Sequence, residues 1–132
     1  MDTCKSLTNY FASELRNLKC SDEVRAYIVS VLSAYKFSEK DLSNHSITVE
    51  YAIARNENDF QRFQTVGDYL FFANSFVPES LNGASSEYYQ SVAQLSYYSC
   101  YRLMNRQWRL YEQMADRFID LSQETRQIIR KF

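Results

Sequence analysis

The chain has 132 residues, which is long enough for one domain to bury a sizeable core. Its formal net charge of −1 excludes a global electrostatic attraction to nucleic acid or to an anionic membrane. The chain contains only 2 Gly and 1 Pro, so the tight turns of a many-stranded sandwich or barrel are scarce. We therefore predict an all-α protein: residues 1–132 form a single compact domain, an irregular or orthogonal bundle of about five to seven helices.

Targeting signals and cysteine usage bear on location. The longest apolar run, residues 69–73, is far shorter than the ~20 residues that span a bilayer. Met1–Lys5 lacks the basic and apolar regions that begin a signal peptide. Cys4, Cys20 and Cys100 are odd in number and follow no pattern, which favours reduced thiols over a disulfide framework. We expect a cytoplasmic protein that does not contact a membrane.

In the first half of the chain, apolar residues at helical spacing predict helices over residues 6–18 and 22–35, the second capped by Ser21. Residues 47–54 alternate like a strand and are rich in β-branched residues. A lone strand would have no partner for its backbone hydrogen bonds, so we predict a helix there and keep the strand as the alternative.

The central stretch is predicted as two helices, residues 60–76 and 87–104, joined by a turn at residues 77–83. Apolar or aromatic residues lie on almost every side of both, which is typical of covered, central helices. A further helical pattern starts at Trp108, and Ser122 is predicted to cap a last short helix.

Gly67 and Asp68 are the sharpest local feature of the sequence. Glycine inside a helix costs about 1 kcal/mol relative to alanine, so we expect close packing at Gly67, with the small residues Ser96 and Cys100 of the next helix nearby. A partly buried carboxylate at Asp68 must be paired or hydrogen-bonded. A structural polar network is favoured over a functional carboxylate. Its predicted members are Asp68, Arg102, Tyr88, Tyr89 and Tyr97.

A basic stripe is the second candidate site. Arg102, Arg106 and Arg109 recur at steps of four and three, so a continuous helix would present them together beside Trp108. Such a stripe could bind a phosphate or an acidic partner. An ordinary solvated face, with Arg109 paired to Glu112, is the favoured interpretation.

Metal and cofactor motifs are missing from the sequence. His45 is the only histidine, is predicted in a polar loop, and has no cysteine or carboxylate at zinc-ligand spacing. Neither glycine lies in a phosphate-binding loop. We expect no metal and no cofactor, and no residue is assigned a catalytic role.

Four segments occur in an order that resembles a family of small bacterial helical proteins without a known activity. They are Asp22–Tyr27, Gly67–Phe72 followed by Phe76–Leu81, Tyr88-Tyr89 and Tyr111–Phe118. The resemblance covers most of the chain from Asp22 to about Leu121, with Asn74-Ser75 in place of an expected glycine-containing pair. It implies a bacterial cytoplasmic protein and carries over no catalytic residue.

Three functions follow as hypotheses. The leading one is a non-enzymatic module that mediates protein–protein interaction or self-association, because 16% aromatic residues exceed what a domain of this size can bury. A homodimer is its simplest form. The alternative is a small-ligand-binding or enzymatic pocket lined by tyrosines, with Asp68 and Arg102 as polar contacts. The third is weak nucleic-acid binding through Arg102, Arg106 and Arg109.

Overall fold

The computed structural model describes residues 3–38, 44–76, 86–106 and 108–129. These residues form seven helices and, among them, no strand, so the predicted all-α class is confirmed. No helix among them is both long and apolar enough to pass through a bilayer. The helices are α1 (Thr3–Glu14), α2 (Asp22–Ser38), α3 (Asn44–Glu57), α4 (Phe60–Phe76), α5 (Ser86–Leu103), α6 (Arg109–Asp116) and α7 (Phe118–Ile129).

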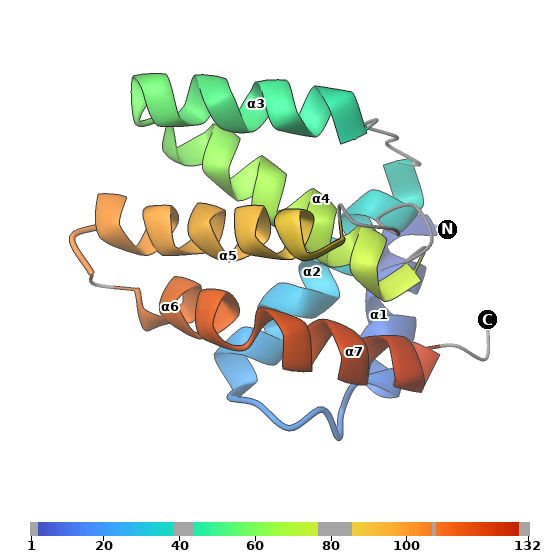
Figure 1. Ribbon diagram of the computed structural model, residues 1–132. Coiled ribbons are helices and arrows are strands. Elements are labelled where there is room, and N and C mark those ends of the chain that lie inside the picture. The colour runs from blue at the N-terminus through green and yellow to red at the C-terminus, as the bar shows by residue number, and fades with distance from the viewer. Residues whose placement is uncertain (1–2, 39–43, 77–85, 107, 130–132) are drawn as a thin grey trace.

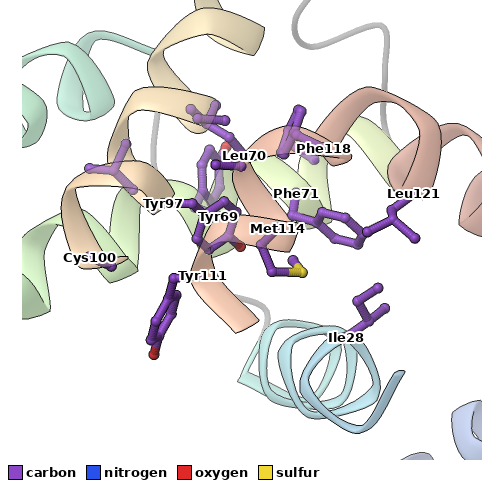
Figure 2. Packing of buried hydrophobic residues seen from close by; sticks show 14 of the residues in the cluster. Ile28, Tyr69, Leu70, Phe71, Tyr97, Cys100, Tyr111, Met114, Phe118 and Leu121 are labelled. Carbon is purple, nitrogen blue, oxygen red and sulfur yellow. The ribbon is translucent and has the colours of Figure 1, made fainter. Parts of the chain in front are cut away.

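Helix α4 is the element on which the others assemble. It contacts α2, α3, α5 and α7, and α6 packs against α5. In Figure 1, α5 runs across the middle of the molecule, with α3 on one side and the α6–α7 pair on the other. Figure 2 shows Phe71 of α4, Tyr97 of α5, Met114 of α6 and Phe118 of α7 in one continuous core, with Ile28 of α2 facing it.

Local signals position the first helices. The Ser21 hydroxyl accepts a hydrogen bond from the Val24 amide at 3.2 Å, which is the predicted N-cap of α2. Helix α1 ends at Glu14, four residues before the predicted end, although Leu15 and Leu18 remain fully buried beyond it. The guanidinium of Arg25 donates to the carbonyl oxygens of Leu18 (2.8 Å) and Cys20 (3.0 Å). These two backbone acceptors in the α1–α2 connection are thereby hydrogen-bonded.

Residues 47–54 lie inside helix α3, so the helix was the correct choice over the strand. Ile47 and Ala54 are buried against the core and Tyr51 is partly buried, so these three residues form the inner side of α3. Asn58 has a φ of 52°, in the left-handed region, and separates α3 from α4.

The second half of the chain differs from the prediction at two places. Helix α5 ends at Leu103 because Asn105 and Arg106 both take positive φ values, 55° and 59°. The last helix begins at Phe118, so Ser122 is inside α7 and does not cap it. Its buried hydroxyl instead accepts a hydrogen bond from the side-chain amide of Asn74 at 2.7 Å, which joins α7 to α4. The predicted turn at residues 77–83 lies outside the described residues.

Gly67 permits a close contact, but not with the residues that we predicted. A Cβ atom at Gly67 would lie 2.9 Å from both Cε1 and Cζ of Tyr97, so the space is filled by a tyrosine ring rather than by Ser96 and Cys100. Tyr97 is fully buried, and its hydroxyl donates to Oδ1 of Asp68 at 2.8 Å. The missing side chain at Gly67 is therefore what admits the Tyr97 ring beside α4.

Gly67→Ala tests this contact. Alanine would favour the helix by about 1 kcal/mol, but overpacking a filled core costs roughly 1–3 kcal/mol. Because the Tyr97 ring is buried and tethered, we expect the overpacking cost to lie in the upper part of this range, about 2–3 kcal/mol. The free energy of unfolding in urea should then fall by about 1–2 kcal/mol.

Tyr97→Leu provides the control background for this substitution. In a Tyr97→Leu background the new methyl group no longer meets a ring, so the higher helix propensity of alanine is the remaining effect of Gly67→Ala. The substitution should then be neutral or stabilising by up to about 1 kcal/mol. An equal loss of stability in both backgrounds would show that the ring contact is not the reason for glycine.

Candidate functional site

Asp68 is the centre of a polar network at the junction of four helices. Its Oδ1 atom accepts hydrogen bonds from the hydroxyls of Tyr27 on α2, at 2.7 Å, and Tyr97 on α5, at 2.8 Å. One turn earlier on α4, the amide of Gln64 donates to the hydroxyl of Tyr111 on α6 at 2.8 Å, and to that of Tyr27 at 3.4 Å. Side chains from α4 therefore fix the positions of α2, α5 and α6.

The rings around Asp68 also contact one another. The Tyr27 ring meets Tyr97 edge-on at 6.4 Å between centroids and Tyr111 edge-on at 5.6 Å. Tyr97 and Tyr111 stack at 6.4 Å, and Tyr97 meets Phe118 of α7 at 6.5 Å. Each hydroxyl thus reaches the carboxylate or the Gln64 amide while its ring belongs to the apolar core.

Burial shifts the titratable groups of this network toward their neutral forms. Burial raises the pKa of Asp68 from 3.8 to about 6, although the hydrogen bonds from Tyr27 and Tyr97 act in the opposite direction. Burial, reinforced by the nearby Asp68 carboxylate, raises the pKa values of Tyr27 and Tyr97. The same two causes raise the pKa of the Cys100 thiol. Neither the two tyrosine hydroxyls nor the Cys100 thiol is therefore activated as a nucleophile near neutral pH.

The predicted members of the network divide into two groups. Tyr97 bonds Asp68, whereas Arg102, five residues further along α5, is exposed. At about 100° per residue, Arg102 points roughly 140° away from Tyr97, so it was wrong to pair it with Asp68. Tyr88 is exposed, and Tyr89 is buried in the apolar core.

Tyr27, Gln64 and Tyr111 belong to the network but were not predicted as members of it. Tyr27 and Tyr111 stood out only as ends of the segments that carry the resemblance, and Gln64 did not stand out at all. The sequence gives little indication of these partners, because each is a polar side chain on an otherwise apolar helix face. The helices that carry them are also far apart in the chain, so no local spacing links them.

The continuous helix that the basic stripe requires does not form. The predicted stripe needs one helix from Arg102 to Arg109. Asn105 and Arg106 have backbone conformations in the left-handed region, and α5 ends before them while α6 begins after them. Arg109 is exposed and pairs with Glu112 at 3.4 Å, as the solvated-face interpretation requires. Trp108 is exposed on one side and stacks on Tyr111 at 6.1 Å between ring centroids.

In the described part of the chain, no group of three or more His, Cys, Asp or Glu side chains could hold a metal ion. His45 lies in the first turn of α3 rather than in a loop, and its side chain is outside the described residues. Cys20 and Cys100 are free, and the side chain of Cys4 is likewise outside the described residues.

Surface hollows lined by described residues lie between α1 and α2, between α2 and α6, between α5 and α6, and on α3. Asp68 lines none of these. The predicted tyrosine-lined pocket with Asp68 and Arg102 as its polar contacts therefore has no counterpart among these hollows.

Helix α5 is not covered on all sides, contrary to our expectation. Tyr88, Leu95 and Tyr98 are 47%, 52% and 42% exposed, respectively. With the exposed Ser91 and Arg102 they recur at steps of three and four, and we call these five residues the outer face of α5. A hollow of about 380 Å³ beside this face is lined by Ser91, Gln94, Leu95, Tyr98, Ala115 and Asp116.

No protein-family model, curated protein or solved structure matches this chain. The resemblance to small bacterial helical proteins therefore stays a prediction.

Asp68 should make stability fall as pH rises. The native state holds its proton up to about pH 6, whereas the unfolded chain releases it near pH 3.8. The stabilising contribution of the protonated carboxyl is thus complete below pH 3.8 and is lost as pH rises through about 6. We expect Asp68→Asn to gain about 2 kcal/mol relative to the wild type between about pH 4.5 and about pH 7.5.

The measurement is urea unfolding of both proteins at each pH, because their difference cancels the titration of all other groups. Asp116→Asn, which removes an exposed carboxylate at the end of α6, is the matched control for loss of one charge. A difference between wild type and Asp68→Asn that stays constant with pH would contradict the perturbed carboxyl.

Proposed function

We propose that this protein is a non-enzymatic helical module of the bacterial cytoplasm that mediates protein–protein interaction, in its simplest form with itself, through the outer face of α5. The supporting observation is the repeat of exposed Tyr88, Leu95 and Tyr98 along one side of that helix. Single exposed apolar residues are ordinary, but three on one stripe make a contiguous surface suited to another protein.

The chemistry of the residues also suits a contact surface. Tyrosine buries a large ring while keeping a polar hydroxyl at its tip, so it is tolerated in water and is enriched at interfaces. The steps of three and four along α5 match the spacing with which one helix packs against another. The hollow beside Leu95 and Tyr98 offers a recess for a side chain of the second molecule.

The Asp68 network supports a structural role rather than a reaction. Its carboxylate Oδ1 is occupied by two tyrosine hydroxyls, and its tyrosines and Cys100 have raised pKa values. In this proposal the network holds α5 in place and the opposite side of α5 makes the contact.

Leu95→Glu is the test of the contact surface. Because Leu95 is 52% exposed, the substitution should leave the thermal unfolding temperature within about 2 °C of the wild type. A charge at the middle of an apolar contact should abolish concentration-dependent association in sedimentation equilibrium.

Val49→Glu is the matched control, since Val49 is 44% exposed and lies on α3. It should associate like the wild type. A wild-type protein that is monomeric at every concentration, or a Leu95→Glu variant that associates normally, would overturn the proposal.

A further inference from the structure

Helix α5 carries opposite charges at its two ends, one of them on the outer face and the other beside it. Glu87 is exposed in the first turn of the helix, and Arg102 is exposed in its last turn. Among the described residues, neither side chain makes an ion pair. Arg102 belongs to the outer face of α5 and Glu87 adjoins it next to Tyr88, so both charges can reach a second molecule bound there.

Tyr88 and Arg102 are placed symmetrically about Leu95. Tyr88 lies seven residues before Leu95 and Arg102 seven residues after it, so each is about 10 Å from Leu95 along the helix axis. Seven residues are close to two turns, and all three side chains consequently project to the same side. A two-fold axis at Leu95, perpendicular to α5, would place Tyr88 of one copy opposite Arg102 of the other.

From this symmetry we infer that the occupant of the outer face of α5 is a second copy of this chain, packed antiparallel with its own α5. This inference rests on the proposed function. Arg102 of each copy lies over the Tyr88 ring of the other as a cation–π pair, with the Glu87 carboxylate beside it. The two Leu95 side chains meet on the axis, where the contact is most apolar.

The same charges disfavour the other arrangements. A parallel pair would bring Arg102 against Arg102 and Glu87 against Glu87, which repel each other. In the antiparallel pair, Arg102 of each copy lies near Glu87 of the other, so the favourable contact occurs twice. The two-fold symmetry uses the same surface on both copies, so no surface is left for a third copy. One helix stripe buries less than the ~800 Å² per partner of a standard interface, so the dimer is weak and reversible.

Site-specific cross-linking tests the arrangement in the full-length chain with Cys4 and Cys20 replaced by serine. Cys100 stays, because it is fully buried. Leu95→Cys should cross-link to itself. Tyr88→Cys alone and Arg102→Cys alone should not, whereas a mixture of these two variants should give a cross-linked heterodimer.

Charge exchange gives a second readout of the same contact. Because each dimer contains the contact twice, Arg102→Glu should weaken association about tenfold in sedimentation equilibrium. The double variant Glu87→Arg/Arg102→Glu should recover the part of that loss that the ion pair contributes, since the exchanged charges face each other again, whereas the cation–π contact with Tyr88 stays lost.

The outcomes separate the arrangement from the proposed function. Self-cross-linking of Tyr88→Cys would mean a parallel pair and would overturn the inference alone. Association that Leu95→Glu abolishes, but without any of the expected cross-links, would also overturn the inference while leaving the interaction surface intact. A strictly monomeric wild type, measured up to about 1 mM, would overturn both.

Discussion

The hydrogen bonds to one oxygen of Asp68 are the constraint on which this structure depends. Tyr27 and Tyr97 come from helices that do not neighbour each other in the sequence, and both hydroxyls converge on the Oδ1 atom of one α4 side chain. Hydrogen bonds have narrow limits of length and angle, unlike apolar contacts, so this pair fixes the rotation of α2 and α5 about their own axes. Hydrophobic burial alone would tolerate several such rotations.

This constraint carries an energetic cost that apolar packing would avoid. Burial is the main cause that raises the Asp68 pKa to about 6, so a carboxylate here is less stable at neutral pH than it would be in water. The two tyrosine hydroxyls offset part of that cost. We interpret the remainder as the cost of specifying one arrangement of the helices.

The fixed rotation of α5 decides which residues the protein presents to its surroundings. Leu95 is two residues from Tyr97, and at about 100° per residue it points roughly 160° away from it. Once the Tyr97 ring is held against Gly67, Leu95 and its neighbours Tyr88 and Tyr98 must face outward. The buried network and the exposed aromatic stripe are thus two sides of a single helix orientation.

Periodicity predicted the helices well and their partners poorly. The bounds of α4 and the helical state of residues 47–54 follow from local spacing and from the lack of a pairing strand. The break at Arg117 was missed because residues 108–121 keep an apolar stripe through it. The Asp68 partners depend on which helix faces which, so Arg102 was chosen for its charge and Tyr27 was overlooked. Only the three-dimensional packing separates a tyrosine that faces Asp68 from one that faces water.

The exposed stripe is better explained by an interaction than by leftover aromatics. The core already holds the rings of Tyr89, Tyr97, Tyr101 and Tyr111, so α5 and α6 do bury tyrosines where packing requires it. A helix face with no partner within the chain is ordinarily polar. The outer face of α5 instead places apolar side chains at the spacing of a helix contact, with an acid before them and an arginine after them. Scattered surface rings would show neither this spacing nor opposite charges at the two ends of the same helix.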